Sequence, residues 1–327
     1  MTLLLTRRDV AELLPIEDCI EAVACAFRLH GERRAEPPGI LSMGAPEGSF
    51  HVKAGFLDLG RRYFAAKTNA NFPGNPGRFG LPTIQGVVLL SDADRGTPLA
   101  IMDSGEITSL RTGAATAVAA RHLSRPDAKI ATVCGCGLQG KAQLRALAAV
   151  RTLSRAYAVD KDHARAVAFA LEMSSALGFE VSAVTDLHAA ARASDICVTC
   201  TPSREPILDA GSVGPGAFIA AVGADSELKQ EIHPALMATS AVVVDMLEQA
   251  VTIGDLHHAL SVGVMTTGDV RAEMGQVVAG VRPGRLSDSE IVIFDSTGMA
   301  LEDVAAAAAV YERAVRAGRG VEIDLAA

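Results

Sequence analysis

Aromatic residues are scarce in this chain of 327 residues: there are 10 Phe and 3 Tyr, which make up 4% of it, and no Trp. Proteins that bind single-stranded nucleic acid by stacking bases on aromatic rings need more of them, so that class is disfavoured. The core must instead be aliphatic, as in a buried parallel sheet. Long apolar runs are also missing, because no stretch approaches the roughly 18 residues of a membrane span and no cleavable signal is visible at the start. We therefore expect a cytoplasmic protein without a membrane partner.

Charge and cysteine content exclude further classes of protein. The 30 Lys and Arg residues against 38 Asp and Glu residues give a net charge of −8, which argues against nucleic acid as the main partner. All six cysteines lie in apolar segments, where free buried thiols are expected: Cys19, Cys25, Cys134, Cys136, Cys197 and Cys200. A four-thiolate zinc site is the alternative for the last four. It is disfavoured because they fall in predicted buried strands or on a glycine turn, so no metal is predicted.

The first third of the chain predicts helices and an antiparallel or mixed sheet. Thr6 is a candidate N-cap, and residues 16–30 carry apolar side chains at helical spacing up to Gly31. Between residues 50 and 102 the runs FHVKAGF, YFAAKT, TIQGVVLLSD and PLAIM read as strands. Residues 104–123 then read as a helix, which Pro126 prevents from continuing. We place a domain boundary there.

Beyond residue 126, apolar strands alternate with helices, which predicts a doubly wound parallel sheet with helices on both faces. The α/β fold expected is thus a Rossmann-type domain over residues 126–300 and an α+β domain over residues 1–125. The order of elements suggests that residues 301–327, which contain the last helix, pack back on the first domain.

A dinucleotide-binding signature opens the second domain. Residues 135–140 read Gly-Cys-Gly-Leu-Gln-Gly between the strand IATVC and a helix. Glycines at Gly135, Gly137 and Gly140 allow a tight turn, a close approach to a pyrophosphate and close packing of helix on strand. Leu138 and Gln139 begin that helix. Asp160, twenty residues after Gly140, ends the next strand, where a carboxylate accepts the ribose hydroxyls and repels a 2′-phosphate. NAD(H) is therefore predicted as the cofactor.

Three cations in apolar stretches of the first domain suggest a carboxylate receptor: Lys53, Lys67 and Arg111. Any one of them alone is more often a surface side chain with a buried stem. Together they suit a small acid, because arginine offers a bidentate fork and a desolvated lysine polarises an imine or carbonyl.

At this point the chain resembles the ornithine cyclodeaminase/mu-crystallin family over essentially its whole length. The resemblance rests on Lys67 followed by NANFPGNP, on GLPTIQGVVLLSDADRGTPLAIMDSGEITSLRTGAAT and on CGCGLQG. It continues in AAVGADSELKQEI, in VVVDMLEQA with IGDLHHAL, and in FDSTGMALEDVA. The family contains archaeal-type alanine dehydrogenases, ketimine reductases and iminosuccinate reductase.

The resemblance implies site residues and an assembly. Lys67 would be the active-site lysine, Arg111 the ligand of the substrate carboxylate and Asp225 the acid beside the reacting carbon. The cofactor residues implied are Thr112 and the Gly135–Gly140 turn for the pyrophosphate, Asp160 for the adenosine ribose, and Ser296, Thr297 and Gly298 near the nicotinamide. The family's N-terminal domain forms a homodimer and is completed by C-terminal residues.

Two departures from the family pattern bear on the substrate. Gly39 follows Pro37-Pro38 where many members carry an arginine that binds the α-carboxylate, and Lys53 can compensate for it. The second departure lies near His51, where a cyclodeaminase is expected to offer a carboxylate to the substrate's second ammonium. This chain has the cation Lys53 there, and its positive charge would repel that ammonium.

We therefore expect an NAD(H)-dependent reductase of α-imino acids that also runs in reverse as an amino-acid dehydrogenase, acting on a small molecule. Lys53 favours a substrate with a second acidic group, such as iminosuccinate. The alternatives are an ornithine or lysine cyclodeaminase, which releases ammonia and recycles its NAD, and a non-catalytic carrier that binds without turnover.

Overall fold

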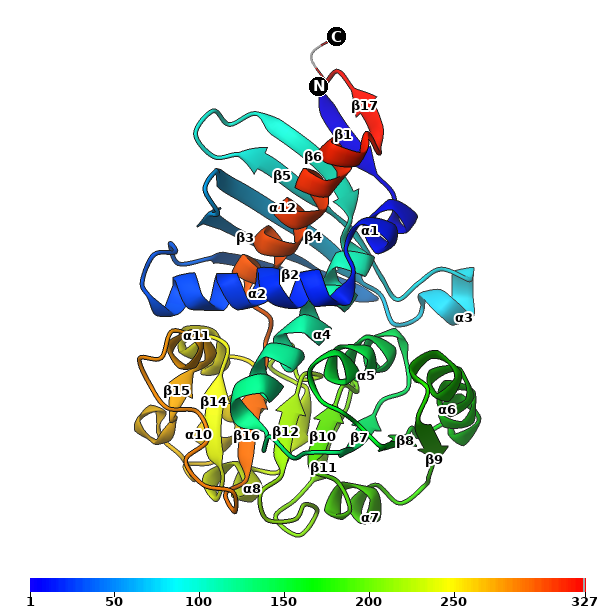
Figure 1. The fold of residues 1–327 in the computed structure, drawn as a ribbon, viewed down its shortest axis with the longest axis vertical. Coiled ribbons are helices and arrows are strands. Elements are labelled where there is room, and N and C mark those ends of the chain that lie inside the picture. Colours follow the sequence, from blue (N-terminus) through cyan, green and yellow to red (C-terminus); the bar gives the residue numbers. More distant parts are fainter. Residues whose placement is uncertain (326) are drawn as a thin grey trace. The chain divides into compact units, whose positions relative to one another are not determined.

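The computed structural model describes residues 1–325 and 327, and the chain divides into two compact units. Unit 1 comprises Met1–Arg111 and Met299–Ala327, and unit 2 comprises Thr112–Gly298 (Figure 1). The helix α4 (Ser104–Leu123), predicted at these bounds, runs through the division. The sequence places the boundary at Pro126 instead, because a helix break is visible in a sequence and a division inside a continuous helix is not. The roles given to residues 1–125 and 126–300 stay predictions.

Unit 1 is built on a seven-stranded mixed sheet. In spatial order its strands are β17 (Val321–Ile323), β1 (Thr2–Leu5), β6 (Pro98–Asp103), β5 (Ile84–Asp92), β4 (Arg62–Asn71), β3 (Gly48–Asp58) and β2 (Gly39–Ala45). The pair β1–β6 is parallel, and the other pairs of this sheet are antiparallel. The antiparallel or mixed sheet predicted over residues 50–102 is confirmed. The strands β1, β2 and β17 extend it beyond the prediction.

The helices of unit 1 begin and end where local signals place them. α1 (Arg7–Leu13) starts after Thr6, whose hydroxyl accepts from the Asp9 amide while the Asp9 carboxylate accepts from the Thr6 amide. α2 (Ile16–Gly31) follows directly, and α3 (Asn75–Phe79) is a single short helix between β4 and β5. The last helix, α12 (Ala300–Ala317), packs against α2 and across β3 and β4, so it belongs to unit 1.

The two faces of this sheet differ in burial. Side chains alternate between the faces of a strand, and in β4 the buried residues are Tyr63, Ala65 and Lys67, on the face that α12 covers. The intervening residues Phe64 and Ala66 are only partly buried, although they are apolar. The opposite face of the sheet is therefore open within unit 1.

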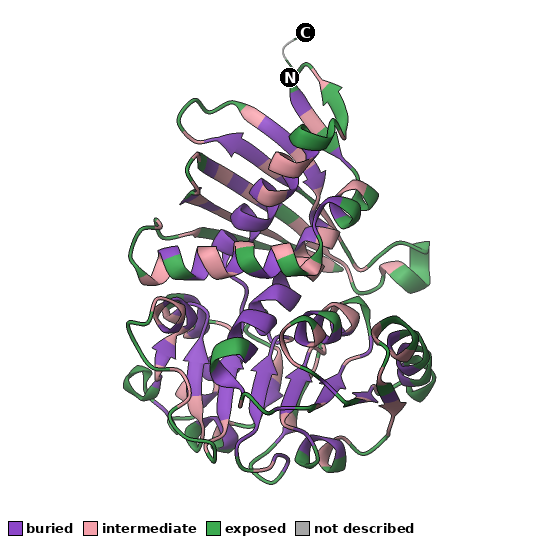
Figure 2. Cartoon of the chain, in the orientation of Figure 1, coloured by how far each residue is buried: buried purple, intermediate pink, exposed green. Residues whose placement is uncertain are grey.

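Unit 2 contains an eight-stranded sheet in which every pairing is parallel. Its order is β15 (Ala272–Glu273), β14 (Ala241–Val244), β16 (Val292–Asp295), β12 (Phe218–Ala221), β10 (Ile196–Thr199), β7 (Ile130–Cys134), β8 (Arg155–Val159) and β9 (Glu180–Ala183). The central strands are fully buried, as their purple colour in Figure 2 shows. The doubly wound parallel sheet predicted from alternating strands and helices is confirmed.

The helices of unit 2 connect these strands. They are α5 (Leu138–Val150), α6 (His163–Leu177), α7 (Leu187–Arg192), α8 (Pro234–Ala238), α9 (Leu247–Ala250), α10 (Asp255–Ser261) and α11 (Met274–Val278), with a short 3₁₀ helix at Thr267–Asp269 and a two-stranded sheet of β11 (Arg204–Leu208) and β13 (Gln230–Ile232). Chain order runs outward from β7 to β9 and then returns to β10, which lies on the other side of β7. Ligands of doubly wound sheets bind at such a switch point, beyond the carboxyl ends of the strands. Over the described part of the chain, none of the helices has the length and apolar character to cross a bilayer.

Candidate active site

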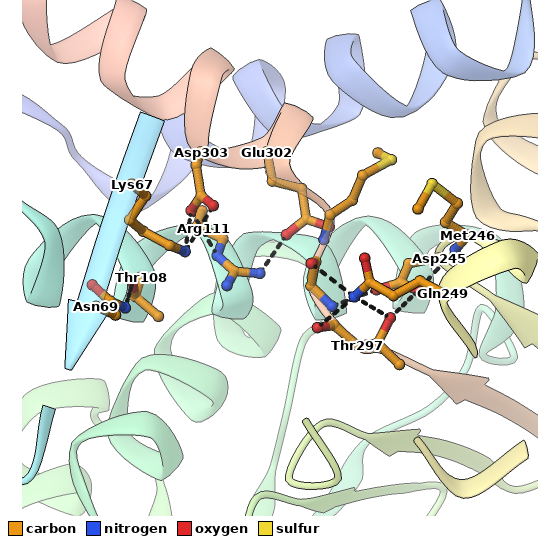
Figure 3. A network of polar contacts seen from close by, with 12 residues as sticks. Lys67, Asn69, Thr108, Arg111, Asp245, Met246, Gln249, Thr297, Glu302 and Asp303 are labelled. Carbon is orange, nitrogen blue, oxygen red and sulfur yellow. Dashed lines mark hydrogen bonds and ion pairs between the residues drawn. The ribbon is translucent and has the colours of Figure 1, made fainter. Parts of the chain in front are cut away.

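Unit 1 holds a buried cluster of two cations and two acids. Lys67 Nζ lies 2.7 Å from both carboxylate oxygens of Asp303, and Arg111 Nε lies 3.1 Å from Oδ1 of the same carboxylate. Arg111 Nη1 also pairs with Glu302 Oε2 at 2.8 Å. Figure 3 shows the basic side chains, from β4 and α4, pointing at the two acids in the first turn of α12. None of these side chains is more than 7% exposed.

The fold explains why these side chains meet. Lys67 lies on the covered face of β4 because it follows Ala65 and Tyr63 at the strand period of two. Glu302 and Asp303 lie in the first turn of α12, where the helix dipole favours negative charge, and Glu302 also accepts from the Met299 amide.

Burial and charge shift the proton affinities inside this cluster. Burial, reinforced by Arg111 and Lys53, lowers the pKa of Lys67 to about 7, although Asp303 opposes the shift. Burial alone would raise the pKa of Asp303, but Lys67 and Arg111 hold it below its ordinary value. Lys67 is therefore able to take up and release a proton near neutral pH.

Lys53 lies on the same face of the sheet as Lys67, because the two are directly opposite each other in the β3–β4 ladder. It is partly buried. His51, two residues earlier in β3, contacts the hydroxyls of Ser42 and Ser49 at 3.0 and 2.7 Å. When all are ionised, the three basic side chains Lys53, Lys67 and Arg111 outnumber the acids Glu302 and Asp303 by one charge.

Sequence reasoning missed Glu302 and Asp303. Both lie within the segment FDSTGMALEDVA that carried part of the family resemblance. A signal was present, since an adjacent acidic pair precedes the run of five alanines at residues 305–309. Charged residues at the start of an alanine-rich helix that must pack on a sheet need a partner in the core.

Unit 2 forms the predicted glycine turn between β7 and α5. Gly135 has a φ of +104°, which disfavours any side chain, and a Cβ on Gly140 would lie 2.1 Å from the Gly135 carbonyl oxygen. A Cβ on Gly137 would meet no atom within 4 Å. The turn is therefore closed around Gly140 and open beside Gly137, as a backbone that a phosphate approaches must be. Leu138 and Gln139 are the first two residues of α5.

Asp160 connects the end of β8 to this turn. Its carboxylate accepts from the Cys136 amide at 2.9 Å and from the Asp162 amide at 3.0 Å, so its position is determined by backbone groups. Thr112, the first residue of unit 2, is buried in α4.

A second polar network of unit 2 follows β16 and contains the residues predicted near the nicotinamide. Asp245 accepts from the Thr297 hydroxyl at 2.8 Å and from the Gly298 amide at 2.5 Å. The Gln249 side-chain amide donates to the Thr297 carbonyl at 3.0 Å and to its hydroxyl at 2.8 Å (Figure 3). Gln249 Oε1 and the Ser296 hydroxyl are buried and have no hydrogen-bond partner among the described residues. Such atoms fit a site completed by a polar ligand.

Three further buried carboxylates lie beside this network. Glu231 accepts from the Thr201 and Gly223 amides, Asp255 from the Glu231 and Ile232 amides, and Asp295 from the Asp255 and Leu256 amides. Burial raises the pKa of all three carboxyls, and that of Asp295 reaches about 7. Glu231 thus holds the loops that follow β10 and β12, Asp255 holds β13, and Asp295 holds the first turn of α10.

Asp225, the predicted acid, lies in the loop after β12. Its carboxylate is exposed and pairs with Lys229 Nζ at 2.5 Å.

The six cysteines are free thiols, and burial raises the pKa of Cys136 to about 12. Within residues 1–325 and 327 no group of acidic, histidine and cysteine side chains has the arrangement of a metal site.

The family of the chain follows from its match to known sequences. A family model described as the ornithine cyclodeaminase/mu-crystallin family matches residues 1–318. The chain belongs to the ornithine cyclodeaminase/mu-crystallin family. The resemblance found in the sequence is thereby confirmed.

Members of this family with known structures share the fold over its full length. The alanine dehydrogenase of Archaeoglobus fulgidus is 38% identical over 322 residues, which cover 98% of this chain and 98% of that protein. A solved archaeal alanine dehydrogenase dimer with bound NAD has a TM-score of 0.94 at 38% identity, with 99% of each chain covered. The Δ1-pyrroline-2-carboxylate reductase of Thermococcus litoralis, solved with NADH and L-proline, has a TM-score of 0.94 at 34% identity. It covers 98% of this chain and 100% of that one.

Proposed function

We propose that this chain is an NAD(H)-dependent oxidoreductase that reduces an α-imino acid to the amino acid and also catalyses the reverse reaction. The buried cluster around Lys67 and Arg111 carries this proposal. Lys53, directly opposite Lys67 in the β3–β4 ladder, adds a third basic side chain beside the two acids, and cations partly removed from water favour an anionic counter-ion. The carboxylate shared by imino and amino acids is such a counter-ion.

Gly137 and the amino end of α5 would hold the pyrophosphate of the dinucleotide, since this side of the glycine turn is open, and Asp160 would hold its adenosine ribose. Ser296 and Gln249 present buried oxygens that a polar ring substituent would satisfy. When bound, a nicotinamide supplies or accepts the hydride. The carboxylate of Asp160 favours NAD(H) over NADP(H), because it would repel a 2′-phosphate.

The chain's own groups bind the substrate and handle its proton. Glu302 and Asp303 hold the Arg111 guanidinium from the side of α12, which orients it toward a carboxylate. Reduction places a hydride on the α-carbon and leaves the C=N electron pair on nitrogen, which then takes up one proton. Lys67 lies in the same cluster and exchanges protons near neutral pH, and Asp225 is the second candidate donor.

A cyclodeaminase is the second candidate, because the family includes that activity. Its diamino acid substrate carries a second ammonium, which the positive cluster and Lys53 disfavour. Ammonia release without a net change in NADH would identify this reaction.

The test is a panel of substrates assayed by NADH absorbance and ammonia release. It contains 2-oxo acids with ammonia or methylamine, 1-pyrroline-2-carboxylate, iminosuccinate and ornithine. We expect NADH oxidation with at least one imine and slower turnover with NADPH. Asp225→Asn should lower kcat by about 10²–10⁴-fold and leave NADH binding unchanged if Asp225 donates the proton. Unchanged turnover of that variant would remove Asp225 from the mechanism, and no turnover of any imine would refute the reductase.

We further propose that the chain forms a homodimer through the open face of the unit 1 sheet. Leu41, Val52, Thr68 and Val87 form one row across this face, since they are cross-strand neighbours in β2 to β5. Leu41, Met43, Phe50 and Val87 are 40–54% exposed in the single chain. An apolar sheet face of this extent is typical of a surface that another protein covers, and the solved archaeal alanine dehydrogenase described above is a dimer.

A further inference from the structure

We propose that Asp303 is a positioning residue that bridges Lys67 and Arg111 and holds the Lys67 amine in its charged form. The inference deepens the proposed function and rests on it for its role in catalysis. The titration of Lys67 that tests it needs neither cofactor nor substrate.

The geometry makes Asp303 a bridge between the two cations. Both of its oxygens lie 2.7 Å from Lys67 Nζ, and Oδ1 also lies 3.1 Å from Arg111 Nε. The Asp303 side chain is 2% exposed and that of Lys67 is 4% exposed, so water screens their interaction little. A single carboxylate therefore determines the distance between the two basic groups.

The groups that face Lys67 come from several elements. Lys53 of β3 is its cross-strand neighbour, with His51 on the same face, and Arg111 of α4 is the nearest other cation. On β5 its partner in the ladder is Val88, which is apolar. From α12, Asp303 contacts Lys67 directly, whereas Glu302 pairs with the guanidinium of Arg111.

This arrangement assigns Asp303 a role distinct from that of Glu302. Burial and the two neighbouring cations favour the neutral amine of Lys67, and the Asp303 carboxylate opposes them. Removing that charge should lower the pKa of Lys67 further, so that the amine is neutral at pH 7. A substrate carboxylate would then meet one positive charge fewer, and no ammonium would be available to donate a proton.

A direct titration of Lys67 tests this role. The chain has six lysines, so protein labelled with ¹³C at lysine Cε gives six resonances, and the Lys67 resonance is the one lost in Lys67→Met. In the wild type it should titrate with a midpoint near pH 7. In Asp303→Asn the midpoint should fall by about one pH unit or more, and in Asp303→Glu it should stay closer to the wild-type value.

Glu302→Gln is the matched control, because it removes the same charge from the preceding residue of the same helix. It should shift the Lys67 midpoint much less than Asp303→Asn does. Equal shifts in the two variants, or no shift in Asp303→Asn, would overturn the inference. If Asp303→Asn does not fold, Asp303→Glu is compared with Glu302→Asp, since each moves its carboxylate by one methylene. The Lys67 midpoint should then shift measurably in Asp303→Glu and less in Glu302→Asp, and equal midpoints in the two variants would overturn the inference.

The pH profile of kcat/KM connects the titration to turnover. For imine reduction, activity should fall as pH rises through the Lys67 midpoint, and the fall should begin at lower pH in Asp303→Asn than in the wild type. A shifted titration in a protein that reduces no imine would refute the proposed function alone. An unshifted titration in an active enzyme would refute the role of Asp303 alone.

Discussion

A single buried carboxyl can make the stability of this protein depend on pH. Asp295 ends β16, is fully buried and accepts hydrogen bonds from the amides of Asp255 and Leu256. Burial, with repulsion from Asp245 and Glu231, raises its pKa from 3.8 to about 7. The folded chain therefore keeps a proton that the unfolded chain has lost between these two values. Stability from this group is greatest below pH 4, declines as pH rises and levels off above pH 7.

Asp295→Asn should remove this decline, because an amide does not ionise. Its single oxygen can accept from only one of the two backbone amides that now donate to separate oxygens of the carboxylate, so the variant should also be less stable at low pH. Between pH 5 and pH 7, the unfolding free energy of the wild type should fall relative to that of the variant by up to about 1.4 kcal/mol per pH unit. Urea denaturation at pH 5, 6 and 7 measures it. The exposed Asp288→Asn serves as the control. A difference that stays constant over this range would show that Asp295 is already ionised at pH 5.

At the scale of elements, the turn from β7 into α5 separates two roles of glycine. A methyl group on Gly140 would collide with the Gly135 carbonyl, so Gly140→Ala should lower both thermal stability and NADH affinity. A methyl group on Gly137 meets no protein atom, and the φ there is −88°. Gly137→Ala should therefore leave the melting temperature unchanged and weaken NADH binding by roughly tenfold or more, about 1.4 kcal/mol. Melting curves and NADH fluorescence titrations of both variants test this pair. Wild-type NADH affinity in Gly137→Ala would mean that no pyrophosphate approaches this turn.

At the scale of the whole molecule, the open face of the unit 1 sheet predicts the state of assembly. A charge in the middle of an apolar interface is desolvated without a partner, so Val87→Glu should convert a dimer into a monomer. Light scattering coupled to gel filtration measures the mass in solution. Leu171→Glu is the matched control, since Leu171 is 71% exposed on α6 of unit 2 and should tolerate the charge. A wild-type monomer, or a Val87→Glu dimer as tight as the control, would contradict this interface.

The elements that sequence reasoning located well are those determined by local signals. The structure has the predicted helices over residues 104–123 and 138–150, and the helix predicted to end at residue 177 does so. Pro126 limits the first, the Gly135–Gly140 turn precedes the second and Gly178 follows the third. The strands β1 and β17 were missed. They are four and three residues long and pair with each other, and β1 also pairs with β6. Strands this short are defined by their partners more than by their own composition.

The parallel sheet, the glycine turn and the acid at the end of β8 followed from the sequence alone, because each depends on neighbours within a few residues or on a motif in one segment. The roles of Lys67 and Arg111 in substrate binding stay predictions. The tertiary structure alone brought Asp303 and Glu302 to these cations, across 236 and 191 residues of chain. It also turned Asp245 toward the loop of Thr297 and left one face of the unit 1 sheet open. Such contacts form when helices and strands distant in sequence pack together, and the proton affinity of a buried group depends on exactly which charges that packing places around it.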